Sequence, residues 1–251
     1  MDSSNQIETG NQDPTTLFYD LTKENKENMT IDYRHSNYKK ILIPLPELTN
    51  KNVAVKQDFR LGKGGIFWDN SFFLTKYLIE KIFPQKDIKH IIEIGAGTAL
   101  PSIASLIKGY HVVVTDIPKL LPFVNDIINM NKDLYSKNSK SEVVQLSWEK
   151  KEDIENAKKL VENGTYDVII GSEVIYLDDL FDDLIYTIRE LSNEKTIILF
   201  SYKVRLQSMV DEFIEKVSKY FELIDIDYEV KNQLYVKPEK MKMLQMKKKK
   251  I

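Results

Sequence analysis

Short apolar runs alternate with segments of helical spacing through the middle of the chain. The apolar runs are six or seven residues long and predict strands at 90–95, 111–116, 142–148, 166–172 and 196–202. Apolar residues spaced three or four apart predict helices at 72–83, 101–109, 120–130, 153–162, 180–191 and 208–220. Buried strands that alternate with helices are typical of a parallel sheet with right-handed crossovers and both faces covered.

Further strands are predicted at the two ends of this pattern. The runs at 41–45 and 53–57 are separated by a short polar segment and predict an N-terminal β-hairpin. The runs at 221–229 and 232–236 are too close together for a crossover connection, so we expect them to pair antiparallel. The predicted fold class is therefore α/β, with a Rossmann-like seven-stranded sheet that is mostly parallel, has an antiparallel C-terminal strand and is preceded by the hairpin.

The composition excludes several kinds of chemistry. The 251 residues include no cysteine, and the only histidines (His35, His90 and His111) do not stand at ligand spacing. Disulfides, thiolate zinc sites and cysteine nucleophiles are therefore excluded, and no metal is expected. No run of eighteen apolar residues occurs, and the polar opening MDSSNQIETG is unlike a secretory signal. We expect no membrane span and a cytoplasmic location, with the nucleus as the alternative.

The formal net charge of −2 is unevenly distributed. Residues 1–33 contain seven acids and two lysines without apolar periodicity, and predict a disordered acidic N-terminal arm. Residues 237–251 contain seven lysines and one glutamate, and predict a solvated basic C-terminal tail, or a weak contact with anionic lipid or nucleic acid. The folded domain is expected to span 34–236. Only four of the 36 basic residues are arginine, so nucleic acid is not an expected partner.

The clearest local motif is the segment Glu93-Ile-Gly95-Ala96-Gly97-Thr, which connects a predicted strand to a predicted helix. Glycines allow a ligand to approach the backbone, and the helix that follows offers unpaired N–H groups. The next strand ends at Asp116, nineteen residues after Gly97. A carboxylate at that position can accept hydrogen bonds from both hydroxyls of a ribose. Together these features indicate a cofactor that carries a nucleoside.

The details of the glycine-rich loop favour S-adenosylmethionine. A dinucleotide fingerprint would have glycine where Leu100 stands, and a phosphate-binding P-loop would require a Gly-Lys-Ser/Thr sequence that is absent. Glu93 lies two residues before the first glycine, where it can hold the ammonium of the methionyl group and would repel a pyrophosphate. An ordinary glycine turn and a NAD-dependent oxidoreductase remain the alternatives at this point.

Five motifs in order resemble the methyltransferase-like protein-lysine methyltransferases, which act on non-histone proteins such as chaperones and translation factors. The segment VIIGSEVIYLDDLF is similar to the strand-four signature of that family. The other similar stretches, at matching order and spacing, lie at 64–78, 91–103, 112–118 and 143–148. The resemblance covers roughly residues 40–236 and implies methyl transfer from S-adenosylmethionine to the ε-amine of a lysine.

The resemblance also implies which residues hold the cofactor. Trp68 would line the pocket beside the methionyl group, and the three residues from Gly95 to Gly97, with Ala96 between them, would wrap the methionyl group and the ribose. Asp116 would hold the ribose hydroxyls. Packing in the core is the alternative role of Trp68.

Four more positions complete the implied site. Trp148 would flank the adenine, and Ser172 would contact the cofactor near its methyl group. Tyr176 would shape the entry for the lysine side chain. From the spacing of Glu173 and Tyr176 at the exit of the strand at 166–172, we further hypothesise that they are the catalytic pair that orients the acceptor amine, with Glu173 or water taking its proton. Core packing is the alternative for Trp148 and Tyr176.

Two positions depart from the family pattern. The family usually has glycine where Ala99 stands, and Ala99 is expected to fit if its φ is negative. The family usually has aspartate where Glu173 stands, so the carboxylate of this chain lies one methylene further from the backbone. These departures leave a non-catalytic binding module open, and a small-molecule acceptor is a second alternative to a protein. The clamp Asn-Pro-Pro-Tyr of enzymes that methylate bases or glutamine is absent.

Overall fold

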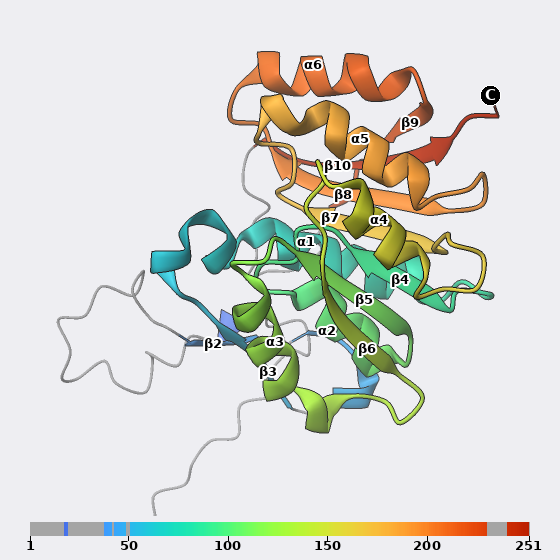
Figure 1. Cartoon of the computed structure of the whole chain (residues 1–251). Helices are drawn as coiled ribbons and strands as arrows, with labels where there is room; N and C mark the ends of the chain where they lie inside the picture. Colours follow the sequence, from blue (N-terminus) through green and yellow to red (C-terminus); the bar gives the residue numbers. More distant parts are fainter. Residues whose placement is uncertain (1–17, 20–37, 42, 49–50, 230–239, 251) are drawn as a thin grey trace, which may run out of the picture.

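The computed structural model describes residues 18–19, 38–41, 43–48, 51–229 and 240–250. Its main element is a seven-stranded sheet in the order β6-β5-β4-β7-β8-β10-β9 (Figure 1). The strands are β4 (His90–Glu93), β5 (His111–Asp116), β6 (Lys140–Gln145), β7 (Val168–Ser172), β8 (Ile197–Lys203), β9 (Phe221–Asp225) and β10 (Met241–Lys248). The pairs among β4 to β8 are parallel, whereas β10 runs antiparallel to both of its neighbours. The predicted mixed α/β sheet is therefore confirmed.

Helices cover both faces of the sheet because the inner strands alternate between two buried sides (Figure 1). Residues such as Ile91, Val112 and Leu199 belong to one core, and their neighbours Ile92 and Val113 belong to the other. The first core is closed by α1 (Asp69–Tyr77), α2 (Leu100–Lys108) and α3 (Leu121–Met130). The second is closed by α4 (Lys151–Lys158), α5 (Phe181–Glu190) and α6 (Gln207–Ser218).

The prediction of a solvated tail at 237–251 is wrong, because most of that segment forms β10. The strand pairs with β8 from Met241 to Met246 and with β9 from Leu244 to Lys248. Met241 and Met243 lie in the first core, whereas Leu244 and Met246 lie in the second. The expected final strand at 232–236 lies outside the described residues. The domain therefore extends to the end of the described chain, well beyond the predicted boundary at 236.

Two lysines at the end of β10 also have structural partners. The Lys248 ammonium donates to the backbone oxygens of Arg189, at 2.6 Å, and of Ser192, at 2.8 Å. The Lys249 ammonium donates to the backbone oxygen of Ser218 at 2.7 Å. These carbonyls stand at or just after the carboxyl ends of α5 and α6, where a helix leaves oxygens without intrahelical partners and favours positive charge.

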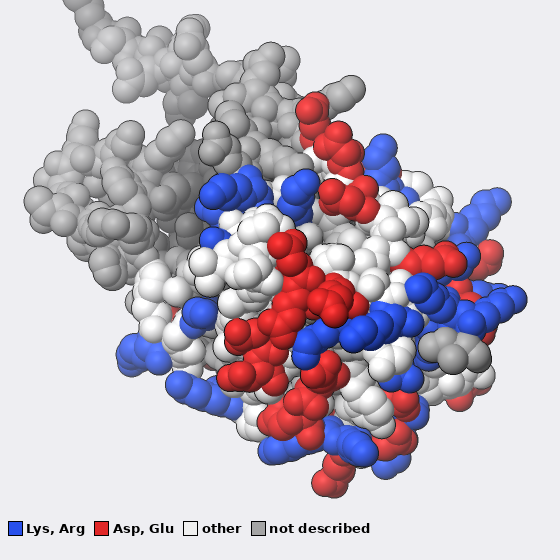
Figure 2. All heavy atoms as spheres, turned by 90° about the horizontal axis from the view of Figure 1, so that it is seen from above, with Lys and Arg blue, Asp and Glu red and all other residues white. Residues whose placement is uncertain are grey.

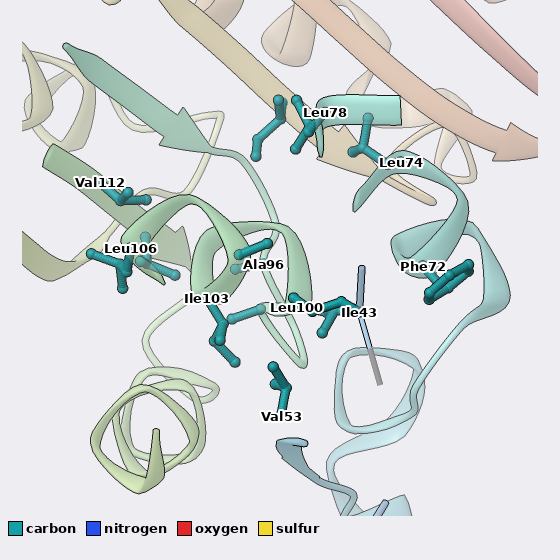
Figure 3. Close-up of a cluster of buried hydrophobic side chains, with 14 of the residues drawn as sticks. Ile43, Val53, Phe72, Leu74, Leu78, Ala96, Leu100, Ile103, Leu106 and Val112 are labelled. Atoms are coloured by element: carbon teal, nitrogen blue, oxygen red, sulfur yellow. The ribbon is translucent and has the colours of Figure 1, made fainter. Parts of the chain in front are cut away.

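A small antiparallel sheet of β1 (Phe18–Tyr19), β2 (Tyr38–Ile41) and β3 (Val53–Lys56) packs beside the first core. Only Ile41 of the strand expected at 41–45 belongs to β2. Apart from β1, the segment predicted to be an acidic arm lies outside the described residues. Figure 3 shows Val53 and Ile43 beside Ile103 and Leu100 of α2.

One buried side chain fastens this small sheet to the main domain. The Asn131 amide accepts from the N–H of Ala54 and donates to its carbonyl, both at 2.9 Å, in the manner of a neighbouring strand. Asn131 follows α3 directly and is 1% exposed. The sheet is therefore held by a specific polar contact as well as by apolar packing.

Charges of both signs are mixed on the face seen from above in Figure 2, where α5 and α6 lie. Lys216 of α6, for example, contacts Asp182 of α5 at 2.7 Å. No helix in the described part of the chain is long and apolar enough to cross a bilayer.

Candidate active site

A cavity of about 720 Å³ lies at the carboxyl edge of the parallel strands. The loops after β4, β5, β6, β7 and β8 line it, together with residues between Leu61 and Trp68. From β4 the chain first adds β5 and β6 on one side of the sheet and then β7 and β8 on the other side. Ligands of open α/β sheets usually bind at the carboxyl ends of the strands at such a change of direction. Nine of the ten predicted site residues line the cavity, namely Trp68, Gly95, Ala96, Gly97, Asp116, Trp148, Ser172, Glu173 and Tyr176. Residues far apart in sequence therefore meet in one place, and their individual roles stay predictions.

The glycine-rich loop needs its glycines at the two predicted positions. Gly95 and Gly97 have φ values of +64° and +52°, in the left-handed region that side chains rarely adopt. A Cβ at Gly97 would also lie 2.9 Å from the carbonyl oxygen of Gly64. Ala99 has φ +53° at the start of α2, so the condition under which it was expected to fit, a negative φ, is not met. This left-handed conformation explains why the family usually has glycine here. In this chain the Cβ of the fully buried Ala99 is crowded against the backbone, which makes the conformation less favourable than it is for glycine.

Asp116 anchors the loop from the end of β5. Its carboxylate accepts from the Gly97 N–H and from the Ile117 N–H, each at 2.8 Å. Burial raises the pKa of Asp116, while these two backbone donors act in the opposite direction. Ile117, 46% exposed, adds an apolar side chain to the same wall. The pair offers a hydrogen-bond acceptor beside an apolar side chain, which suit a ribose hydroxyl and the base attached to the ribose.

Glu93 does not line the cavity, unlike the other predicted cofactor residues. It is fully buried, and its Oε2 accepts from both the N–H and the hydroxyl of Ser102 in α2. Its other oxygen, Oε1, is buried without a hydrogen-bond partner. Burial raises the pKa of Glu93 to about 8, against the lowering influence of Ser102. The predicted contact of Glu93 with the cofactor ammonium therefore stays a prediction.

The raised pKa of Glu93 predicts a pH-dependent stability of the protein without cofactor. A carboxyl whose pKa rises on folding binds its proton more tightly in the native state. Its stabilising contribution to the unfolding free energy is therefore fully present below about pH 4.5 and is lost as the pH rises toward about 8. Relative to Glu93→Gln, the wild type should lose at least about 1 kcal/mol of unfolding free energy between pH 5 and pH 8. Urea unfolding at both pH values measures this, and parallel pH dependence of the two proteins would contradict it.

The two tryptophans line the same cavity. The Trp68 indole N–H donates to the Lys63 backbone oxygen at 3.0 Å. The Arg205 guanidinium lies 5.3 Å from the Trp68 ring, within cation–π range. A Cβ built on Gly95 would stand 3.8 Å from the Trp148 ring, so that ring borders the loop closely. Both rings border the cavity, which fits the flat walls expected beside a purine and a sulfonium.

The predicted catalytic pair follows β7. Glu173 has φ +58°, and its side chain is 9% exposed. Its Oε1 accepts from the Asn70 amide, and its Oε2 pairs with Arg205 Nη1 at 2.6 Å. The Tyr176 ring lies under the Lys63 ammonium, 4.6 Å from the ring centroid. Burial, with a further contribution from the charge of Asp116, raises the pKa of the Tyr176 hydroxyl.

Three participants were missed by the sequence analysis: Asn70, Arg205 and Lys63. Arg205 is one of only four arginines and stands just after a predicted strand, which is a signal that could have identified it. Lys63 stands between glycines in the sequence GKGG, immediately before the Trp-Asp motif. Asn70 carries no comparable signal, because a polar residue in the first turn of a helix is ordinary.

The residues fit S-adenosylmethionine. The volume lies within the range of small-molecule sites, the glycines leave the backbone open, and a buried carboxylate stands at the ribose position. The charged residues that line the cavity are three cations and three anions, namely Lys63, Lys203, Arg205, Asp116, Glu149 and Glu173. A cofactor with an ammonium, a sulfonium and one carboxylate suits such a mixed wall better than a pyrophosphate does.

Comparison with known proteins places this site in a family. A family model described as lysine methyltransferase matches residues 47–223. The protein N-lysine methyltransferase METTL21A of Xenopus tropicalis is 32% identical over 194 residues, 76% of this chain and 84% of that protein. The EEF1A lysine methyltransferase 3 of the same organism is 31% identical, over 64% of this chain and 67% of its own length.

Solved structures agree on the fold. A Streptococcus mutans protein assigned to the SAM-dependent methyltransferases matches with a TM-score of 0.59 at 16% identity, over 84% of this chain and 56% of that one. The PH0226 protein of Pyrococcus horikoshii matches with a TM-score of 0.54 at 11% identity, over 76% of this chain and 96% of that one.

Proposed function

The chain belongs to the lysine methyltransferase family and is a protein N-lysine methyltransferase that uses S-adenosylmethionine as methyl donor; on that premise, we propose that its acceptor is a lysine of a non-histone protein of the translation-factor or chaperone type. The family excludes the oxidoreductase alternative. A cytoplasmic location, where such acceptors are made and used, belongs to the same proposal.

The observation that carries the proposal is the mouth of the cavity. Leu177 and Leu206 line it and are 37% and 60% exposed, beside the acceptor pair formed by Glu173 and Tyr176. Large apolar side chains exposed at the rim of a site favour contact with a partner surface over contact with water. The small antiparallel sheet β1-β2-β3 and the acidic N-terminal arm are proposed to add to this protein-binding surface.

The proposed chemistry assigns a task to each group of residues. S-adenosylmethionine, when bound, supplies a methyl group activated by positively charged sulfur. Gly95, Ala96, Gly97 and Asp116 would hold the cofactor, with Trp68, Trp148 and Ser172 around it. Alignment then provides most of the rate, since a displacement on an activated carbon depends chiefly on the approach of the nucleophile.

The acceptor side has a separate task. The free ε-amine of lysine has a pKa of about 10.4, so the amine must lose its proton before it can attack. Glu173 and Tyr176 would orient the amine, and an apolar, partly closed channel would lower its pKa. The proton would leave to water or to Glu173.

Purified acceptors test the proposed substrate class. We expect tritium from labelled S-adenosylmethionine to enter an elongation factor 1A-type protein or an Hsp70-type chaperone, in the native form more than after denaturation. Mass spectrometry should place the label on one lysine, and its replacement by arginine should abolish labelling. Label on neither protein, or transfer only to free lysine and other small amines, would contradict the proposal.

A further inference from the structure

The carboxylate proposed to meet the acceptor amine, that of Glu173, already has hydrogen-bond partners. Both Glu173 oxygens have donors, Asn70 on Oε1 and the Arg205 guanidinium on Oε2, and the latter contact is an ion pair at 2.6 Å. The three side chains come from α1, from the exit of β7 and from the loop after β8. Arg205 also lies 5.3 Å from the Trp68 ring, so two contacts fix its guanidinium at the mouth of the cavity.

The backbone holds Glu173 in this position. Its φ of +58° is uncommon for a residue with a side chain, and its N–H donates to the Ser201 carbonyl at 2.8 Å. The Ser201 hydroxyl donates in turn to the Asn70 carbonyl at 2.9 Å. The glutamate side chain is one methylene longer than the aspartate usual in the family. It reaches two donors on neighbouring elements, the Asn70 amide and the Arg205 guanidinium.

This pairing changes what the site offers to an incoming lysine. An unpaired carboxylate would stabilise the protonated ammonium and raise the pKa of the acceptor by about 1–3 units. The methyl transfer needs the opposite, because the nitrogen forms its bond to the methyl carbon with its lone pair while the carbon–sulfur bond breaks. The product of this step is a methylated ammonium, which then releases one proton to water.

The other charged groups that line the cavity come from four parts of the chain. Lys63 and Asp116 approach from the segment before α1 and from β5, Glu149 from the exit of β6, and Lys203 from the end of β8. These two cations and two anions balance each other, so the pairing of Glu173 decides whether an unpaired carboxylate meets the incoming amine. Without Arg205, Glu173 would be such a carboxylate and would favour retention of the ammonium.

We propose that Arg205 is a positioning residue that neutralises Glu173, so that the acceptor channel admits the unprotonated amine in preference to the ammonium. This inference rests on the proposed acceptor role of Glu173. Asn70 completes the arrangement, because it satisfies the second oxygen without adding charge.

Binding of n-butylamine, a mimic of the lysine side chain, tests the charge preference without a protein acceptor. The chain has two tryptophans, so the Trp68 indole N–H signal can be followed by NMR in protein saturated with S-adenosylhomocysteine. At pH 7 the wild type should bind butylammonium no more tightly than neutral 1-butanol. Arg205→Ala should favour butylammonium at least tenfold, while Arg205→Lys should keep the wild-type ratio.

Matched variants identify the source of the effect. Lys203→Ala removes a cation from the same strand exit without touching the ion pair, and should change the ratio by less than threefold. Glu173→Gln combined with Arg205→Ala should restore weak butylammonium binding. An unchanged ratio in Arg205→Ala, or an Arg205→Lys protein that behaves like Arg205→Ala, would overturn the proposal.

The pH–rate profile on an acceptor lysine gives the second readout. Arg205→Ala should lower kcat about tenfold at pH 7, with KM equal or lower, and should approach the wild type near pH 9.5. A deficit of equal size at every pH would mean that Arg205 is merely structural. If no protein acceptor is found, the substrate class fails, while the butylamine measurements still decide the role of Arg205.

Discussion

A chain truncated after Lys240 is expected to lose cooperative unfolding altogether. The missing segment contains Met241, Met243, Leu244 and Met246, each no more than 3% exposed. Burial of such a side chain contributes about 1.5–3 kcal/mol. Four of them approach the whole stability of a typical domain, about 5–15 kcal/mol.

The loss of hydrogen bonds adds to this effect. β10 pairs with β8 on one side and β9 on the other, so its removal leaves two strand edges open in the interior of the sheet. Circular dichroism during thermal and urea unfolding measures the outcome. A matched truncation after Lys249 keeps β10 and should unfold cooperatively like the full chain. A folded, cofactor-binding protein that ends at Lys240 would contradict the assignment of β10.

The second large effect is expected from Asp116→Asn, which should weaken S-adenosylhomocysteine binding about 100-fold. A hydrogen bond to a charged group contributes about 1.5–3 kcal/mol, and about 1.4 kcal/mol corresponds to a factor of ten. The amide also places an NH₂ group against one of the two backbone donors that now bind the carboxylate, at Gly97 or at Ile117. Both the ligand contact and the loop geometry therefore suffer.

Titration calorimetry measures this affinity, and a chemically matched substitution supplies the control. Asp126→Asn removes a carboxylate from α3 that is 59% exposed and contacts Lys56, outside the cavity. Its affinity should equal that of the wild type. An Asp116→Asn protein that stays folded and binds within threefold of the wild type would exclude Asp116 as the ribose ligand.

The parallel half of the sheet could be predicted because its strands are buried on both faces. The run at 111–116 matches β5 residue for residue, since six consecutive positions pack against helices or neighbouring strands. β10 was missed because its lysines dominate the composition, although Met241 and Met243 already show the alternation of a strand. Lysines flank the buried positions and carry their charge to the surface or to helix ends, so net charge was a poor guide there.

The site was predictable where one short motif fixes the backbone, and less so where distant loops meet. The glycine-rich loop and Asp116 follow from strand–turn–helix geometry within a single unit of the sheet. The contact of Glu173 with Arg205 joins loops after two different strands, and its partner Asn70 comes from a third element. The positive φ of Ala99 could not be predicted from the residue type, because alanine favours negative φ.

The position of β10 also has a consequence for the order of folding. β10 follows β9 in the chain but lies between β8 and β9 in the sheet, and β9 has no other neighbour in the described sheet. β9 therefore cannot join the sheet, and the second core cannot close, before residues 241–248 are available for pairing. β4 to β8 need no contact with β10 to pair with one another, so the parallel part of the sheet can form first.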